Sequence, residues 1–163
     1  MKYAFYPGCV SKGGTPELYE ATVKVAEKLE FELEEMKDVG CTGAGVLSRE
    51  ISDPINARTF AKAEMSNLPI MTICSTCQGV MTQAQHRLKD EEYRNHINSE
   101  FLSDEGLEYK GTVEIRHMLW AVVEDFGLDR LKNIVVRSLE GLPVAHFYGC
   151  YLKRPPELMV PPE

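Results

Sequence analysis

The chain has 163 residues, of which 44% are hydrophobic and 26% are charged, and its formal net charge is −7. This composition is typical of a folded globular protein and argues against a disordered one. The acidic balance and the scattered Lys and Arg argue against nucleic-acid binding, because neutralising phosphates needs clustered cations.

Four short segments have the character of β-strands, three of them largely apolar and one in which Phe31 and Leu33 alternate with glutamates. They lie at residues 2–6, 31–36, 69–73 and 143–147, and most of them are bounded by Pro or Gly. Thr15-Pro16 and Asp53-Pro54 are cap-plus-proline signatures, which predict helices running to about residues 30 and 66. A further helix is expected from Cys74 toward residue 89.

Two more amphipathic helices are expected in the last third of the chain, from Ile115 and from Leu128. Strands that alternate with helices predict an α/β fold. We therefore expect a mainly parallel sheet of about four strands, with helices on both faces. His117 falls beside the apolar face of its helix and is interpreted as a packed or capped histidine rather than a ligand.

The cellular compartment is suggested by the N-terminus and the cysteine count. Residues 1–7 lack the apolar core of a secretory signal, and no stretch approaches the roughly 20 apolar residues that span a bilayer. We expect a cytoplasmic protein. Five cysteines fit poorly with a closed disulfide framework, and close-set cysteines in a reducing compartment more often bind metal or carry out redox chemistry.

The cysteines follow the predicted strands. Cys9 comes after the first strand, Cys41 after the second, Cys74 and Cys77 after the third, and Cys150 after the last. Ligands in open α/β sheets collect at the carboxyl ends of the strands, so the first four cysteines are expected to converge. Four thiolates around one point can hold zinc or an iron–sulfur cluster.

The Cys74-Ser75-Thr76-Cys77 pair lies where a helix is expected to begin. Free N–H groups and the positive end of the helix dipole favour thiolates there. A dithiol of the thioredoxin kind, a structural four-thiolate zinc site and inert buried cysteines are the alternatives. An iron–sulfur site is favoured because Cys9 and Cys41 also follow strand ends.

The cysteine spacing resembles that of a known family. Cys9 is followed by 31 residues, then by Cys41-Thr42-Gly43, and later by Cys74-x-x-Cys77. This pattern is similar to the motif of the cysteine-rich CCG domains, and Tyr6-Pro7-Gly8-Cys9 resembles the start of that family. The family includes the B subunit of heterodisulfide reductase and the corresponding subunit of some succinate dehydrogenases and fumarate reductases.

The resemblance implies an iron–sulfur cluster, [4Fe–4S] in type, held by Cys9, Cys41, Cys74 and Cys77. It implies one subunit of an oxidoreductase complex, passing electrons between a partner iron–sulfur subunit and a disulfide or a quinone. Its partners would be iron–sulfur and flavoprotein subunits, with membrane contact only through the complex at the inner membrane face. The Cys-Thr-Gly variant and the opening sequence favour the succinate dehydrogenase or fumarate reductase branch.

Two departures from the family motif leave the cluster type open. Thr42 stands where the motif has a second cysteine, and the gap before Cys74 is shorter than the family's. A threonine hydroxyl is a poor substitute for a thiolate. The alternative is a structural zinc-binding or partner-docking module with no redox role of its own.

The Tyr-Gly-Cys sequence at residues 148–150 echoes the sequence around Cys9, at an offset of 141 residues. Such families carry two copies of the cysteine-rich domain. We therefore expect residues 1–147 to form the first copy, and residues 148–163 to begin the connection to a second copy that is absent here.

Overall fold

The structure is a computed structural model that describes residues 1–145 and 150–152. Within these residues the sheet has four strands in the order β2-β1-β3-β4, which are β1 (Lys2–Tyr6), β2 (Glu32–Glu35), β3 (Ile70–Thr72) and β4 (Ile115–His117). All three pairings are parallel. The predicted α/β fold with a parallel sheet is confirmed.

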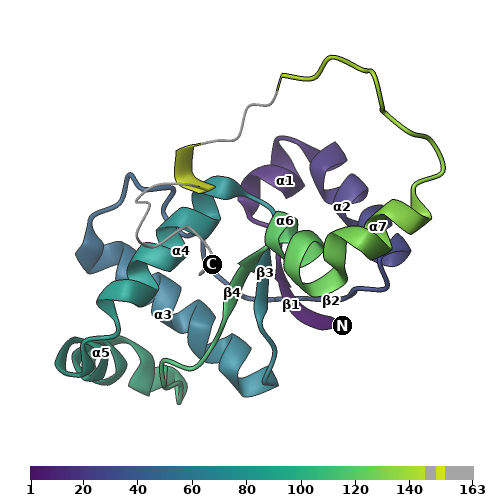
Figure 1. Cartoon of the computed structure of the whole chain (residues 1–163). Helices are drawn as coiled ribbons and strands as arrows, with labels where there is room; N and C mark the ends of the chain where they lie inside the picture. The colour runs from purple at the N-terminus through teal and green to yellow at the C-terminus, as the bar shows by residue number, and fades with distance from the viewer. Residues whose placement is uncertain (146–149, 153–163) are drawn as a thin grey trace.

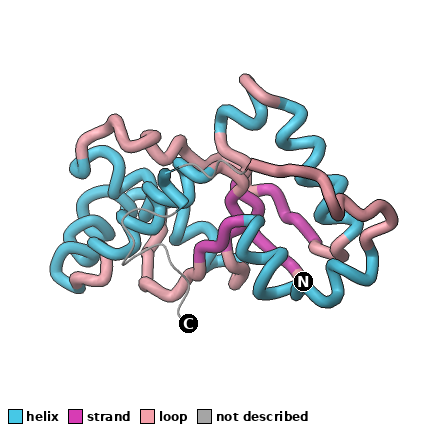
Figure 2. Tube along the Cα trace, turned by 45° about the horizontal axis from the view of Figure 1, so that its top comes forward, coloured by secondary structure: helices cyan, strands magenta, loops and turns pink. Residues whose placement is uncertain are grey.

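Helices cover both faces of this sheet, as predicted. They are α1 (Cys9–Gly13), α2 (Pro16–Lys28), α3 (Arg49–Ser66), α4 (Ser75–Arg87), α5 (Glu91–Ile97), α6 (Met118–Trp120) and α7 (Leu128–Ile134), with shorter π-helical or 3-10 segments η1 (Asn98–Leu102), η2 (Ser103–Glu105), η3 (Ala121–Gly127) and η4 (Cys150–Leu152). Figure 1 shows α3, α4 and α5 on one side of the strands and α1, α2, α6 and α7 on the other. Figure 2 shows the strands in the centre, between the two groups.

Strand β1 contributes residues to both hydrophobic clusters of the core because it is buried on both faces. Ala4 and Tyr6 belong to the apolar cluster that includes Phe60 of α3. Tyr3 and Phe5 belong to the opposite cluster, with Phe31, Ala26 and Phe126. Alternate residues of a strand point to opposite faces, and a parallel strand covered by helices on both sides is apolar throughout. This burial explains why residues 3–6 form an apolar run.

The fourth strand was predicted in the wrong place. It lies at Ile115–His117, where a helix was expected to begin, and it pairs with β3 through Ile70 opposite Ile115. The helix prediction failed because Ile115 has the helical spacing of Leu119 and Phe126, which lie in the helical segment directly after the strand. The predicted strand at 143–147 is wrong for residues 143–145, which are exposed and form no strand, while residues 146 and 147 lie outside the described residues.

Helix α3 begins earlier than its proline signature predicted. It starts at Arg49, with Ser48 as the N-cap residue, and Pro54 lies inside the helix. The carboxylate of Asp53 does not cap a helix, because it is fully buried and paired with Arg87 of α4. The other predicted helices are found at α2, α4, α7 and the α6–η3 segment.

Candidate functional site

The cysteines lie at the carboxyl edge of three neighbouring strands. Cys9 is the first residue of α1, after β1; Cys41 is in the loop after β2; and Cys74 is the N-cap residue of α4, after β3. Cys77 lies in the first turn of α4. In a parallel sheet these connections emerge on the same side, which brings the four thiols to one edge.

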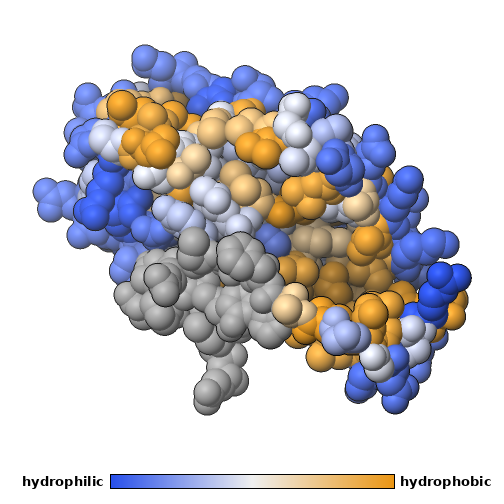
Figure 3. Space-filling model, turned by 90° about the horizontal axis from the view of Figure 1, so that it is seen from above, coloured by the Kyte–Doolittle hydropathy of each residue, from blue (hydrophilic) through white to orange (hydrophobic). Residues whose placement is uncertain are grey.

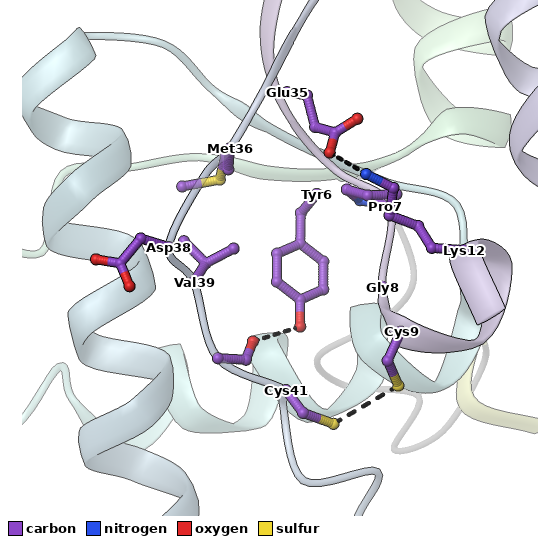
Figure 4. Close-up of a pocket in the computed structure, with 11 residues that line it drawn as sticks. Tyr6, Pro7, Gly8, Cys9, Lys12, Glu35, Met36, Asp38, Val39 and Cys41 are labelled. Atoms are coloured by element: carbon purple, nitrogen blue, oxygen red, sulfur yellow. Dashed lines mark hydrogen bonds and ion pairs between the residues drawn. The ribbon is translucent and has the colours of Figure 1, made fainter.

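Two of the thiols are in direct contact at the surface. The Sγ atoms of Cys9 and Cys41 are 3.9 Å apart (Figure 4), and both residues are exposed. The backbone N–H of Gly43 lies 3.5 Å from the Sγ of Cys41 and donates to it. The neighbouring Cys41 thiol raises the pKa of Cys9. A positive charge bound beside these two thiols would therefore favour their ionised form.

The Cys77 thiol and the Cβ of Cys74 lie close to Gly8, directly before Cys9. Gly8 has a φ of 79°, and a Cβ atom built on it would lie 3.3 Å from the Sγ of Cys77 and 3.9 Å from the Cβ of Cys74. A positive φ and this close approach both favour glycine. Gly8 thus lets the turn that carries Cys9 approach the turn that carries Cys74 and Cys77.

The start of α4 separates the pKa values of its two cysteines. The Cys77 side chain and the backbone N–H groups of Cys77 and Thr76 lower the pKa of Cys74 to about 5. The adjacent Cys74 and burial raise the pKa of Cys77. Unpaired N–H groups at a helix N-terminus stabilise one negative charge readily. A second negative charge there requires a cation.

Polar side chains fix the loops that carry the cysteines. The Tyr6 hydroxyl donates to the carbonyl oxygen of Gly40 at 2.8 Å, which joins the end of β1 to the Cys41 loop (Figure 4). The Ser11 hydroxyl donates to the carbonyl oxygen of Pro7 at 2.8 Å. Gln78, next to Cys77, accepts from the Thr72 hydroxyl at 2.7 Å. These roles were not predicted, because their only signal in the sequence is that some of these residues lie close to a cysteine.

A cleft opens beside the Cys9 and Cys41 thiols. Its volume is about 190 Å³, and it is lined by Tyr6, Pro7, Gly8, Cys9, Lys12, Glu35, Met36, Asp38, Val39, Gly40 and Cys41. Lys12 forms an ion pair with Glu35 across it, and the Tyr19 hydroxyl donates to the same carboxylate at 2.7 Å. Solvent and small molecules therefore have access to the Cys9 and Cys41 side of the site.

Thr42 leaves one polar atom unpaired at the site. Its side chain is 1% exposed, and its Oγ1 has no hydrogen-bond partner among the described residues. Its carbonyl oxygen, in contrast, accepts from Nδ2 of Asn56 at 3.2 Å. Burying an unpaired hydroxyl costs free energy. The hydroxyl is thus available to a group bound next to Cys41 and Cys77.

The donor set suits a thiophilic metal or an iron–sulfur cluster, because four cysteines and backbone N–H groups lie at one edge. The arrangement is not an assembled coordination shell: in the described part of the chain, no group of three or more His, Cys, Asp or Glu side chains is positioned to hold a metal ion. The structure places all four cysteines at the same sheet edge and brings the Cys9 and Cys41 thiols into contact, but it does not bring the four thiols to one point as predicted. Their role as ligands stays a prediction.

The surface at this edge is partly apolar. Figure 3, which looks onto the molecule from above, shows hydrophobic side chains around a hollow. Exposed apolar residues also follow the ends of several strands: Val10 in α1, Val46 and Leu47 in the Cys41 loop, and Leu119 in α6.

Residues 3–82, which include all four of these cysteines, match the family described as "Cysteine-rich domain", CCG. This part of the chain is therefore a cysteine-rich domain of the CCG family.

The chain as a whole is homologous to subunits of redox complexes. It is 36% identical over 159 residues to the 8-methylmenaquinol:fumarate reductase membrane anchor subunit of Wolinella succinogenes, covering 94% of this chain and 54% of the relative. It is 29% identical over 163 residues to a protein of Archaeoglobus profundus described as like the B subunit of heterodisulfide reductase, covering 97% and 54%. It is 27% identical over 158 residues to the B subunit of the ferredoxin/F420H2-dependent CoB-CoM heterodisulfide reductase of Methanosarcina acetivorans, covering 94% and 52%.

The chain thus spans about half the length of these curated relatives. The recognition of the family from the cysteine spacing is confirmed. Within residues 1–145 and 150–152, no helix has the length and apolarity required to cross a membrane.

Proposed function

We propose that this chain is an iron–sulfur electron-transfer domain of a multi-subunit oxidoreductase, with a cluster held by Cys9, Cys41, Cys74 and Cys77. The observation that carries the proposal is the arrangement around Gly8. The Cys77 thiol approaches Gly8 itself, and the neighbouring Cys9 thiol lies 3.9 Å from that of Cys41. An iron–sulfur cluster would supply one-electron chemistry at this edge when bound.

The raised pKa values of two of the thiols support binding of a positively charged group. Cys9 and Cys77 have raised pKa values because each lies beside another thiol. Binding of iron or zinc requires thiolates and would remove those protons. The free N–H groups at the start of α4 can donate hydrogen bonds to thiolate or sulfide, which is one of the levers that set the reduction potential.

The type of cluster proposed is [4Fe–4S], with four cysteine ligands. Thr42 supplies a neutral hydroxyl where the family motif has another cysteine, and four thiolates match the number that an ordinary cluster of this type uses. A zinc site is the second candidate, because zinc takes the same four thiolates and needs no redox change.

The electron partners are proposed from the relatives. The names of these relatives describe a fumarate reductase subunit and heterodisulfide reductase subunits. We propose that this chain passes electrons between a partner iron–sulfur subunit and a disulfide or a quinone, within a complex that also contains a flavoprotein subunit. The stronger identity to the fumarate reductase subunit supports that branch, and its description as a membrane anchor supports a position at the inner membrane face.

The apolar residues exposed after several strand ends are further candidates for contact with other subunits. We further propose that residues 148–163 lead toward a second cysteine-rich copy, on the grounds that Gly149-Cys150 repeats Gly8-Cys9.

The test is the iron, zinc and acid-labile sulfide content of protein purified without oxygen. About four irons and four sulfides per chain support the proposal. The matched variants are Cys41→Ala, which should lose the iron, and Cys150→Ala, which should keep it. One zinc without sulfide would favour the structural module instead, and a protein with neither iron nor zinc would contradict both candidates.

A further inference from the structure

Tyr151 lies between the two segments that carry Cys41 and Cys77. It belongs to η4, which Figure 1 shows as the short yellow segment at the upper end of α4. Tyr151 itself is partly buried, and the next residue, Leu152, is 6% exposed. The segment is therefore packed onto the domain through two consecutive side chains.

The contact with α4 is made at Gly79, two residues after Cys77. A Cβ atom built on Gly79 would lie 2.4 Å from Cδ1 of Tyr151, 3.0 Å from its Cβ and 3.0 Å from its carbonyl oxygen. Such distances are well below van der Waals contact between carbon atoms. Tyr151 thus packs directly on the helix backbone, and any side chain at position 79 would displace it.

The contact with the Cys41 loop is made at Gly45. A Cβ atom built there would lie 2.6 Å from the Tyr151 hydroxyl oxygen, and Gly45 has a φ of 74°. In the described part of the chain, residues 43–47 make no hydrogen bond to another helix or strand. Val46 and Leu47 of this loop are exposed. The Tyr151 ring is consequently a principal contact that holds this half of the loop against α4.

We propose that Tyr151 is a positioning residue that clips the Cys41 loop to the helix carrying Cys77. One edge of its ring packs on Gly79, and its hydroxyl end meets Gly45. The clip acts together with the Tyr6–Gly40 and Asn56–Thr42 hydrogen bonds to hold the Cys41 loop in place relative to the Cys77 thiol. This inference rests on the proposed function only in treating Cys41 and Cys77 as ligands of one group; the positioning itself is a property of the metal-free protein.

The proposal is tested first on metal-free protein, by the rate at which an alkylating reagent modifies each cysteine, read by mass spectrometry. Gly79→Ala adds a methyl group that meets the ring, and Tyr151→Ala removes the ring. Each should raise the alkylation rate of the buried Cys77 by about tenfold or more, because the loop opens locally. Tyr151→Phe removes the hydroxyl but keeps the ring, whose Cζ would lie 3.4 Å from a Cβ atom on Gly45, and it should raise the rate less than Tyr151→Ala does.

Combining the substitutions separates a clash from a general loss of structure. Gly79→Ala with Tyr151→Ala should be no worse than Tyr151→Ala alone, because the added methyl group no longer meets the ring. Gly13→Ala is the matched control, since it adds a methyl group to a helix where no other atom lies within 4 Å. It should leave the Cys77 rate unchanged.

A control for overall destabilisation is Glu64→Gln, because Glu64 accepts four hydrogen bonds from Lys110, Thr112 and Val113 in contacts separate from Tyr151 and the cysteine loops. If Glu64→Gln exposes Cys77 as much as Tyr151→Ala does, the effect is general loosening and the proposal is overturned. It is also overturned if Tyr151→Ala leaves the rate unchanged.

A second readout uses protein loaded with iron and sulfide. Tyr151→Ala should change the electron paramagnetic resonance spectrum of the bound cluster, and Tyr151→Phe should change it less. A faster Cys77 alkylation together with protein that binds neither iron nor sulfide would support the clip while contradicting the proposed function. Failure of the Tyr151 proposal and failure of the proposed iron–sulfur function therefore give different results.

Discussion

The Arg87 guanidinium of α4 reaches α3 and donates through both Nε and Nη2 to the carboxylate of Asp53, which is fully buried; the Nε–Oδ2 distance is 2.8 Å. The Tyr93 hydroxyl of α5 donates to the same carboxylate at 3.1 Å. One buried carboxylate thereby joins three helices on one face of the sheet. The pair joins α3 to the C-terminal end of α4, the helix whose N-terminus carries the cysteine pair.

Removing the arginine should destabilise the domain strongly. Arg87→Ala leaves the charge of Asp53 buried and unpaired, and breaking a buried pair in this way costs about 3–5 kcal/mol. Replacing both residues, with Asp53→Ala and Arg87→Ala together, should cost less than Arg87→Ala alone, because no charge is left unpaired. Urea unfolding of the three metal-free proteins measures this. A loss below about 1 kcal/mol for Arg87→Ala, the value typical of an exposed pair, would contradict the structural role.

His117 should make the stability of the metal-free domain depend on pH. The ring is 6% exposed, its Nδ1 accepts from the backbone N–H of Leu119 at 3.2 Å, and its Nε2 has no partner among the described residues. Burial lowers the pKa of His117 from 6.5 to about 4. The unfolded chain therefore binds a proton between these values while the folded protein does not, so stability falls as the pH drops through this window.

The lowering of the His117 pKa from 6.5 to about 4 corresponds to about 3 kcal/mol of stability, fully present above about pH 6.5 and lost by about pH 4. His117→Asn keeps an acceptor for the Leu119 N–H and cannot titrate. Urea midpoints of the two proteins between pH 7 and 4.5 should therefore converge, with the unchanged protein losing more. Parallel pH profiles would show that the histidine is protonated without penalty in the fold.

The fold was largely predictable because its two central strands, β1 and β3, are mostly apolar and several of its helices have clear starts. Residues 3–6 and 70–73 are buried and therefore have a nearly continuous apolar sequence. Ile115–His117 was missed because three residues are too few to show a period, and the helix that follows shares their spacing. The segment 143–147 shows the reverse error: an apolar run alone does not make a strand, and Val144 is 68% exposed.

The candidate site was predictable in its location but not in its internal contacts. The position of Cys9, Cys41 and Cys74 after successive strands follows from the chain order and the parallel topology. The contact of Cys9 with Cys41, and of Gly8 with Cys77, depends on loop conformations that no short-range pattern encodes. Tyr151 could not be assigned a role from sequence, because its partners Gly45 and Gly79 are recognised only by the space they leave.

Cys74 should react faster than Cys9 with an alkylating reagent, although Cys9 is more exposed. At pH 6.5 Cys74, with a pKa of about 5, is mainly thiolate, whereas the raised pKa of Cys9 keeps that residue protonated. The thiolate is the nucleophile, so iodoacetamide should modify Cys74 at least about tenfold faster than Cys9 in metal-free protein.

The control for this prediction is Cys77→Ala, which removes the first cause of the lowered pKa and should slow the reaction at Cys74. Peptide mass spectrometry at several times of reaction gives both rates. Faster modification of Cys9 at pH 6.5 would mean that exposure, rather than ionisation, decides reactivity at this edge.

Thr42 should show a trade-off between stability and retention of the bound group. Its buried hydroxyl has no partner among the described residues, so Thr42→Val, which replaces the hydroxyl by a methyl group of similar size, should stabilise the metal-free protein by about 1 kcal/mol. If the hydroxyl donates to a ligand sulfur in the loaded protein, the same change should speed the loss of iron to a chelator. Thr42→Ser keeps the hydroxyl and should hold iron as the unchanged protein does.

Equal iron retention in all three proteins would contradict a role for the hydroxyl in binding and leave Thr42 as a packing residue. A Thr42→Val protein that is less stable without metal would show that the hydroxyl already has a partner in the fold.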